Sequence, residues 1–407
     1  MTGKQNAPEI RFEGFTDPWE QRKLGSIAAS FDYGLNAAAT EYDGQNKYLR
    51  ITDIDDTTHE FLKSDLTTPL ADLAMSADYL LEEGDLLFAR TGASVGKTYL
   101  YRQYDGTVYF AGFLIRARIG ESADPEFVYQ ATLTDAYKKY VAITSQRSGQ
   151  PGVNAQEYAD YQLMLPSRTE QQQIGMTLRS LDNLITLHQR KYDKLCTVKK
   201  SMLDKMFPKP GETEPEIRFE GFTDPWEQRK LGELYSLVSE KNDLTFGRES
   251  IISVANMYFN ANVNVTDEQY LRTYNVMRLG DIAFEGHSNK EFSHGRFVEN
   301  YIGDGIVSHI FTVLRPRVPF DVNYWRYAIN NEKLMRLSLI RSTKASTMMH
   351  DLVPSDFLRE AIPTPTLAEQ KEIGAFLVGL DHLITLHQRK LELLRNIKKS
   401  LLDRMFV

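Results

Sequence analysis

Four polar loops hold the side chains of this 407-residue chain that are best suited to bind a ligand. Two follow similar strand-like segments and read ARTGASVGKTYLYR (89–102) and EGHSNKEFSHGRF (285–297). Two lie further along each half and read TSQRSGQPGVNAQEY (144–158) and IRSTKASTMMHDLVPSDF (340–357). Their Arg, Lys, Asn, Gln, Ser and Thr side chains can contact phosphates and hydrogen-bond base edges, and their glycines let the backbone approach a partner. The pattern favours contact with nucleic acid, and the alternative is that these loops are solvated turns.

Motifs for nucleotide binding, methyl transfer or metal binding are not found. Residues 92–98, GASVGKT, resemble a phosphate-binding loop, but only three residues separate the glycine from GK, where that motif has four. The YLYR segment that follows predicts a strand, whereas a phosphate-binding loop opens a helix. The sequence also lacks GxGxxG after a strand, HExxH, CxxC and an Asn-Pro-Pro-aromatic tetrapeptide. We therefore expect no catalytic residue, metal or cofactor in this chain.

Composition predicts a globular protein without disulfides or membrane spans. Apolar residues make up 42% and charged residues 25% of the chain, and the net charge is −7. Cys196 is the only cysteine, which fits a reducing compartment. The N-terminal MTGKQNAPEIRF lacks the apolar core of a signal peptide, and no run approaches the ~20 apolar residues of a membrane-spanning helix. We therefore expect a cytoplasmic protein that does not enter a membrane.

Strand-like and helix-like segments are mixed in two blocks, 26–164 and 233–362. The first block contains YLRITDI, GDLLFAR, KTYLYR and FLIRARI, and the second contains SIISV, GDIAFEG, GRFVEN and HIFTVLRP. Helices are predicted at 125–142 and 320–338. GDLLF and GDIAF occupy matching places, whereas the loops that follow them differ. The predicted fold class is α+β, with two mixed α/β domains built on one framework.

The segments outside these blocks occur twice. Residues 8–25 and 215–232 both read PEIRFEGFTDPWEQRKLG, and residues 184–191 and 383–390 both read LITLHQRK. The second pair belongs to longer matching segments that run from TEQQQIG to LDKMF and from AEQKEIG to LDRMF. Head, variable block and helix thus occur twice in this order, which predicts a pseudo-twofold, circular internal repeat.

Two long helices are predicted from the longer repeats. Ser167-x-x-Glu170 and Thr366-x-x-Glu369 are capping boxes. Apolar residues then recur every three or four positions, as in a heptad seam interrupted by histidine and lysine. About 38 residues at ~1.5 Å each give a helix of roughly 55 Å. The predicted seam residues are Leu181, Ile185, His188 and Leu195 in the first helix and Leu380, Ile384, His387 and Leu394 in the second.

Pairing the two helices would bury both seams and make the pair antiparallel, with one variable block at each end. The alternative is that both are core helices of a single large domain. The two histidines are interpreted as seam residues rather than metal ligands, because no second His or Cys lies at ligand spacing beside either. The predicted boundaries are a first domain at 1–165, a helix at 166–207, a linker at 208–214, a second domain at 215–364 and a helix at 365–407.

The repeated head, the GDLLFARTGASVGKT stretch, the SGQPGVN loop and the helix from EQQQI to ITLHQRK together resemble the specificity subunit of a type I restriction–modification system. The resemblance covers essentially the whole chain. It implies two target-recognition domains that each read one half of a split, asymmetric DNA site, and a helix pair that sets the distance between the halves. It also implies a non-catalytic subunit that positions two methyltransferase subunits and joins restriction (translocase) subunits. S-adenosylmethionine, ATP and Mg would be bound by those partners.

Carried over by position, the resemblance implies which loop residues contact double-stranded DNA. In the first domain they are Arg90, Ser94, Lys97, Gln146 and Arg147, and in the second they are His287, Asn289, Lys290, Arg341 and Lys344. The first block has 11 Lys and Arg against 20 Asp and Glu, so its DNA face must be a local patch. We therefore expect this chain to bind DNA weakly alone and more tightly with its methyltransferase partners.

Two other functions compete with this interpretation. One is a coiled-coil adaptor that joins two proteins without contacting DNA. The other is an enzyme with an unrecognised site, which ATP hydrolysis or methyl transfer by the isolated chain would reveal. Exchange of block 26–164 separates DNA recognition from the adaptor, because only a DNA reader changes half of a methylated sequence.

Overall fold

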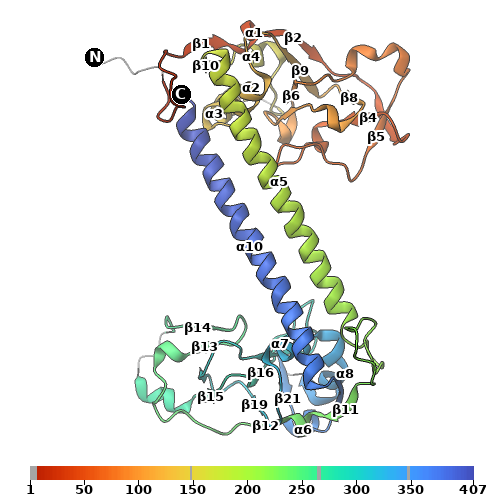
Figure 1. The fold of residues 1–407 in the computed structure, drawn as a ribbon, viewed down its shortest axis with the longest axis vertical. Coiled ribbons are helices and arrows are strands. Elements are labelled where there is room, and N and C mark those ends of the chain that lie inside the picture. The colour runs from red at the N-terminus through yellow and green to blue at the C-terminus, as the bar shows by residue number, and fades with distance from the viewer. Residues whose placement is uncertain (1–6, 147–148, 264–266, 346–348) are drawn as a thin grey trace. The chain divides into compact units, whose positions relative to one another are not determined.

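The chain folds into two compact units, each of which contains a mixed α/β domain and parts of two long helices. Unit 1 comprises residues 1–190 and 388–407, and unit 2 comprises residues 191–387. The long helices are α5 (Arg168–Lys205) and α10 (Leu367–Met405) (Figure 1). The structure, a computed structural model, describes residues 7–146, 149–263, 267–345 and 349–407.

The mixed domain of unit 1, called domain 1, contains short strands and short helices. Its strands are β1 (Glu20–Lys23), β2 (Ala28–Tyr33), β3 (Ala38–Glu41), β4 (Lys47–Leu49), β5 (Thr67–Leu70), β6 (Asp85–Ala89), β7 (Thr98–Leu100), β8 (Val108–Phe110), β9 (Leu114–Ile119) and β10 (Gln162–Leu165). Its helices are α1 (Leu24–Ile27), α2 (Pro125–Ala131), α3 (Asp135–Thr144) and α4 (Ala155–Ala159).

The mixed domain of unit 2, called domain 2, follows a similar order. Its strands are β11 (Glu227–Lys230), β12 (Tyr235–Leu237), β13 (Ile252–Ser253), β14 (Tyr258–Phe259), β15 (Asn275–Met277), β16 (Ile282–Glu285), β17 (Arg296–Glu299), β18 (Gly305–Val307), β19 (Val313–Pro316), β20 (Thr343–Ala345), β21 (His350–Leu352) and β22 (Ala361–Thr364). Its helices are α6 (Leu231–Leu234), α7 (Val322–Ala328), α8 (Glu332–Ser342) and α9 (Pro354–Phe357).

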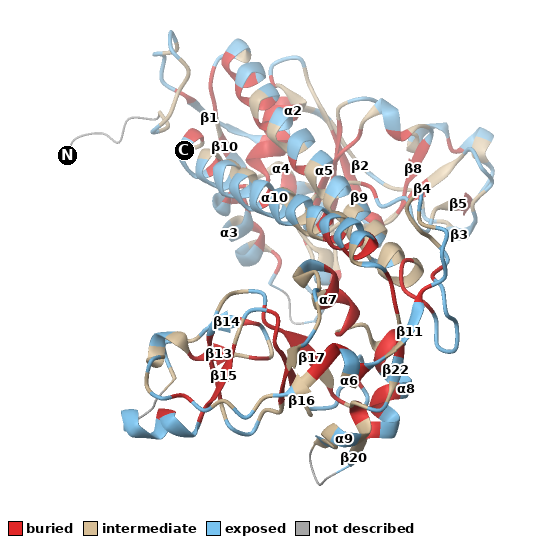
Figure 2. Ribbon diagram, turned by 60° about the horizontal axis from the view of Figure 1, so that its bottom comes forward, coloured by how far each residue is buried: buried red, intermediate tan, exposed pale blue. Residues whose placement is uncertain are grey.

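Both domains are built around the same four-stranded antiparallel sheet. The strand order is β2-β9-β6-β7 in domain 1 and β12-β19-β16-β17 in domain 2. The GDLLF and GDIAF segments form β6 and β16, which occupy the same place in the two sheets. All residues of β6 and the first three of β16 are buried, and Figure 2 shows buried segments in both mixed domains. The predicted common framework is therefore confirmed.

The Gly-Asp pair at the start of each of these segments has a structural role. Gly84 and Gly280 have φ of +89° and +86°, a conformation that glycine adopts without strain. Asp85 is buried and lies 3.2 Å from the Nε of Arg118, and the equivalent Asp281 lies 2.9 Å from the Nη2 of Arg315. Burial raises the pKa of both carboxyls above the usual value. The repeated Gly-Asp pair thus stabilises the start of the central strand.

The helices predicted at 125–142 and 320–338 are each divided in two. Thr134 interrupts the first, because its hydroxyl accepts a hydrogen bond from the backbone N–H of Tyr137 and starts α3. Asn331 does the same in domain 2, where its side-chain oxygen accepts from the N–H of Leu334 and starts α8. The single-helix predictions are wrong here because an internal N-cap ends one helix and begins another.

Only half of each predicted capping box is formed. The hydroxyls of Ser167 and Thr366 accept hydrogen bonds from the backbone N–H groups of Glu170 and Glu369, at 3.4 and 3.3 Å. The glutamates do not return a bond to the cap residue. Each carboxylate is buried and binds an arginine of the repeated head instead, because a bidentate ion pair satisfies both of its oxygens.

The repeated heads join the ends of the long helices. In unit 1 the guanidinium of Arg11 binds Glu170 at 2.7 and 2.8 Å, and the N–H of Ile10 donates to the carbonyl of Arg404 at the end of α10. In unit 2, Arg218 binds Glu369 at 2.8 Å, and Ile217 donates to the carbonyl of Lys205 at the end of α5. Each head therefore links the start of one long helix to the end of the other. The segments that each head contacts belong to the repeated long helices, so both heads make the same contacts. This accounts for the identity of the two heads.

The long helices pack against each other within each unit. In unit 1 the Nζ of Lys398 lies 2.6 Å from Asp182, and Arg395 donates to Gln189. Residue numbers rise along α5 where they fall along α10, so the two segments are antiparallel. In unit 2, Lys199 lies 2.5 Å from Asp381. Among the described helices, none has the length and apolarity needed to cross a membrane.

Candidate nucleic-acid interface

The two predicted loops of domain 1 contact each other at the end of strand β6. The N–H of Gly92 donates to the carbonyl of Pro151 at 3.0 Å, and the N–H of Val153 donates to the carbonyl of Arg90 at 2.9 Å. Thr91 also forms a β-bridge with Gly152. Backbone contacts thus join two loop segments that lie about 60 residues apart in the sequence.

Glycines allow this loop pair to close. Gly96 has φ of +83°, and a Cβ there would lie 2.5 Å from the Cγ1 of Val141. Its carbonyl accepts from the hydroxyl of Tyr137, and its N–H donates to the hydroxyl of Tyr158. A side chain at this position would therefore displace α3, so the GASVGKT glycines serve packing. The strand predicted after this segment is confirmed as β7.

Residues 92–96 also match the Gly-x-Ser-x-Gly pattern of hydrolase nucleophiles, which the sequence-based prediction missed. That pattern acts where the serine sits on a turn from a strand into a helix. Ser94 instead lies in a half-buried 3₁₀ turn that leads into strand β7. The local fold therefore gives no support to a nucleophilic serine.

The two predicted loops of domain 2 meet at the equivalent end of strand β16. The N–H of His350, on strand β21, which pairs with β20, donates to the carbonyl of Gly286 at 2.8 Å. A Cβ on Gly286 would lie 2.1 Å from the carbonyl oxygen of His350, so only glycine permits this approach. The rings of His294 and His350 lie 5.2 Å apart. Domain 2 thus presents imidazoles where domain 1 presents amides and hydroxyls.

The predicted contact residues of domain 1 differ in exposure. Arg90 is half-buried, with its guanidinium 4.9 Å from the ring centre of Tyr33. The side chain of Lys97 is only 12% exposed, and its Nζ binds the carbonyl of Ile54 and the carboxylate of Asp56. Ser94 is half-buried and Gln146 is exposed. Arg147 lies outside the described residues.

The predicted contact residues of domain 2 lie on two surfaces. His287, Lys290 and Lys344 are exposed on the joined loops. The side-chain oxygen of Asn289 accepts from the backbone N–H groups of residues 291 and 292, at 2.8 Å each, and so holds its own loop. Arg341 lies at the end of α8 and is 3.1 Å from Glu360, near the linker. The roles of these residues in DNA contact stay predictions.

Sequence reasoning missed three aromatic side chains of these surfaces. Tyr33 comes from β2 and packs under Arg90, and the rings of His294 and His350 contact each other at a tilt of 55°. The HSNKEFSHG segment signals His294 by composition, but nothing local places it against His350. In the described part of the chain, no group of His, Cys, Asp or Glu is arranged to hold a metal ion.

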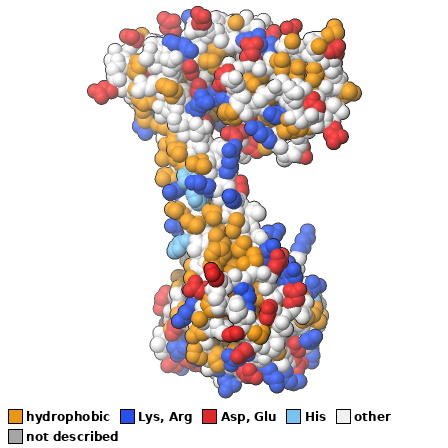
Figure 3. All heavy atoms as spheres, turned by 45° about the vertical axis from the view of Figure 1, so that its right-hand side comes forward, with side chains coloured by type: hydrophobic (Ala, Val, Ile, Leu, Met, Phe, Trp, Pro, Cys, Tyr) orange, Lys and Arg blue, Asp and Glu red, His pale blue; other side chains and the backbone are white. Residues whose placement is uncertain are grey.

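The predicted seam residues are buried or half-buried on the long helices. Ile185 and Leu380 are buried, and the remaining six are half-buried. Four leucines of the repeated LITLHQRK segments point outward instead and are 43–46% exposed: Leu184, Leu187, Leu383 and Leu386. Figure 3 shows apolar side chains and histidines at the surface of the long helices. The same apolar pair is thus exposed in each unit.

Comparisons with known proteins agree with these features. Residues 16–196 match the family described as "Type I restriction modification DNA specificity domain". The chain is 22% identical over 430 residues to the type I restriction enzyme MjaVIII specificity subunit of Methanocaldococcus jannaschii, with 98% of this chain and 95% of that protein covered. It is 19% identical over 428 residues to the putative type I restriction enzyme MjaX specificity subunit of the same organism, with the same coverage.

The fold is also similar to that of a solved protein. The crystal structure of the S subunit of a type I restriction–modification system from M. genitalium superposes with a TM-score of 0.64. The two chains are 13% identical, and the superposition covers 98% of this chain and 99% of that one. The likeness in fold therefore extends over both repeats.

Proposed function

We propose that this chain, which belongs to the type I restriction–modification specificity subunits, reads a DNA site made of two unlike halves, with one domain on each half. The observation that carries this proposal is the pair of equivalent sheets. Strands β6 and β16 have the same place in the two sheets, and each ends in two contacting loops. The sheets share one framework, whereas the loops differ in sequence. Two readers of different specificity have this arrangement.

The chemistry of the loops suits different bases. Loop residues of domain 1 offer a half-buried arginine and exposed glutamines, which bind guanine and adenine edges in the major groove. Those of domain 2 offer Lys290, Lys344 and three imidazoles from His287, His294 and His350. Lysines bind phosphates as well as guanine. The proposed half-sites therefore differ because the donors and acceptors of the loops differ.

The helix pair has two proposed roles, as spacer between the readers and as dock for two methyltransferase subunits. The docking role is supported by Leu184 with Leu187 and by Leu383 with Leu386, which expose the same apolar surface once in each unit. Two copies of one partner would bind two copies of one surface. The proposed complex includes restriction subunits, and S-adenosylmethionine, ATP and Mg belong to the partners, while this chain contributes no catalysis.

Lengthening the helix pair tests the spacer role. Four helix-forming residues inserted after Arg190 in α5 and after Arg389 in α10 add about 6 Å to each helix. One base pair rises about 3.4 Å, so the gap between methylated half-sites should grow by about one to two base pairs while the bases read stay the same. The measurement is sequencing of methylated adenines in cells that also make the partner subunits.

A matched insertion controls for disturbance of the chain. Four residues placed in the exposed linker segment 209–214 should leave the gap unchanged. If the helix insertions also leave the gap unchanged, while methylation persists, the helices do not set the spacing.

A further inference from the structure

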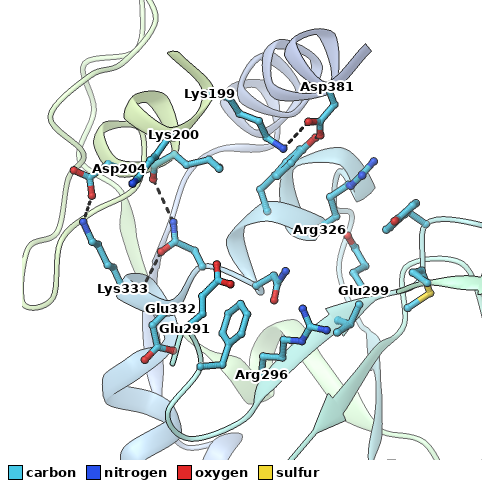
Figure 4. A pocket seen from close by; sticks show the side chains of 18 of the residues that line it. Lys199, Lys200, Asp204, Glu291, Arg296, Glu299, Arg326, Glu332, Lys333 and Asp381 are labelled. Carbon is cyan, nitrogen blue, oxygen red and sulfur yellow. Dashed lines mark hydrogen bonds and ion pairs between the residues drawn. The ribbon is translucent and has the colours of Figure 1, made fainter. Parts of the chain in front are cut away.

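One aspartate of each unit binds both long helices to the mixed domain. In unit 2, Asp381 of α10 accepts a hydrogen bond from the Nζ of Lys199 on α5 at 2.5 Å through Oδ1 (Figure 4). Its Oδ2 accepts from the hydroxyl of Tyr327 on α7, also at 2.5 Å. Tyr327 is 9% exposed, so this bond is shielded from water. A single carboxylate therefore joins three elements of unit 2.

Unit 1 has the same arrangement with a different donor. Asp182 of α5 accepts from the Nζ of Lys398 on α10 at 2.6 Å through Oδ1. Its Oδ2 accepts from the Nε2 of Gln130 at 2.8 Å. Gln130 is buried and is the sixth residue of α2, as Tyr327 is the sixth residue of α7. The helix residues are identical in the two units, and the domain supplies an amide in one and a phenol in the other.

A second contact lies seven residues earlier on each helix. A Cβ on Gly374 would lie 2.6 Å from the backbone nitrogen of Tyr324, and a Cβ on Gly175 would lie 3.1 Å from the Cβ of Glu126. The helix and domain backbones therefore touch closely at this glycine. Seven residues are about two helical turns, so the glycine and the aspartate lie on one face of the helix, about 10 Å apart.

Beyond the aspartate, the domain and the helices diverge around a cavity. The cavity of unit 2 has a volume of about 770 Å³, and the cavity of unit 1 about 470 Å³. On the helix side, both cavities are lined by residues of the same types at equivalent positions of the repeat. They are Lys199, Lys200, Leu203, Asp204 and Asp381 in unit 2, and Lys398, Lys399, Leu402, Asp403 and Asp182 in unit 1. The aspartate thus lies between the close glycine contact on one side and the cavity on the other. In unit 2 the far rim is bridged by Lys333 to Asp204.

We propose that Asp182 and Asp381 are positioning residues that fix the angle between each recognition domain and the helix pair. Apolar residues of the same helix face, among them Leu178 in unit 1 and Leu377 in unit 2, pack in the core of the domain beside the glycine contact. The aspartate adds a directional polar contact at the edge of the cavity, and we expect it to limit movement of the domain into that space. This inference rests on the proposed function, since the angle then determines which gap between half-sites both domains can reach together.

Removing the domain-side donor tests the inference. Tyr327→Phe keeps the ring and loses the bond to Asp381, and Gln130→Met keeps the side-chain volume and loses the bond to Asp182. The assay is the methylation rate, by the complex with methyltransferase subunits, of DNA with the native gap and with gaps one base pair shorter or longer. For each variant we expect the preference for the native gap to fall about tenfold, or about 1.4 kcal/mol, with the bases read unchanged.

Rescue and control variants separate positioning from stability. Tyr327→Gln supplies the amide donor that unit 1 uses, and it should restore the preference. Tyr301→Phe removes a hydroxyl from the same cavity wall, where it makes no hydrogen bond with the described residues, and should change nothing. An unchanged gap preference in both donor variants overturns the inference, as does loss of methylation at every gap together with a lowered melting temperature. If the wild-type complex has no gap preference at all, the proposed function fails first.

Discussion

A chain in which residues 26–164 are replaced by a second copy of residues 233–362 will direct its methyltransferase partners to a palindromic site, both halves of which are the second half of the native site. The exchange is structurally matched. Gln171 accepts from the N–H of Asp124 in unit 1, as Gln370 accepts from the N–H of Asp321 in unit 2. Asp182 can bind Tyr327 of the new block as Asp381 does. Each block therefore meets the same residues at either helix.

The effect on native sites should be large. Each mismatched base pair costs about 1–3 kcal/mol, so three mismatches in one half lower methylation of the native site by at least about 10²-fold. Sequencing of methylated adenines measures both the loss of the native site and the gain of the palindrome. Continued methylation of the native site by the exchanged chain would show that residues 26–164 do not read DNA. It would favour the adaptor alternative.

Aspartate in place of Leu184 and Leu187 will release one methyltransferase subunit, and aspartate in place of Leu383 and Leu386 will release the other. Burying a leucine side chain in an interface is worth about 1.5–3 kcal/mol, and an unpaired buried carboxylate adds a penalty. Two such changes should weaken binding at that site by at least about 100-fold. The side chains are exposed in the isolated chain, so its own stability should change little. Native mass spectrometry counts the bound subunits.

The control uses an apolar residue that is exposed but not repeated. Leu393 of α10 is 59% exposed, and Lys194 stands at its counterpart in α5. Leu393→Asp should leave two methyltransferase subunits bound. Two subunits bound to the chain with all four leucines replaced would contradict docking at this surface.

Elements defined by local patterns could be predicted from the sequence. The long helices follow from their apolar periodicity and from Ser167 and Thr366 as N-caps, because both signals lie within the segment itself. Strands β6 and β16 follow from the repeated Gly-Asp start and the apolar run. The division of the helices near Thr134 and Asn331 was also signalled locally, but the helical periodicity on both sides concealed it.

Contacts between distant segments could not be predicted. Glu170 satisfies the local pattern of a capping box, yet it binds Arg11, which lies 159 residues away. Lys97 has the residue type of a DNA contact, yet Asp56 and the carbonyl of Ile54 hold it inside the domain. Residue type states which bonds a side chain can make, and the tertiary fold decides which of them form.

The junction of domain and helix shows the same limit. Asp182 and Asp381 are separated by the same number of residues as Lys199 and Lys398, so both residue types recur at equivalent positions of the repeat, which indicates a shared role. Their third partners, Gln130 and Tyr327, share neither type nor local sequence, and only the equivalence of α2 and α7 reveals them.

The most direct test of the central claim is to sequence the methylated adenines in cells that make the wild-type chain and its partner subunits. Two dissimilar domains on a symmetric carrier predict one motif with two unlike halves separated by a gap of fixed length. A single contiguous motif, a palindrome, or a methylation pattern that is unaffected by deleting this chain would contradict the claim.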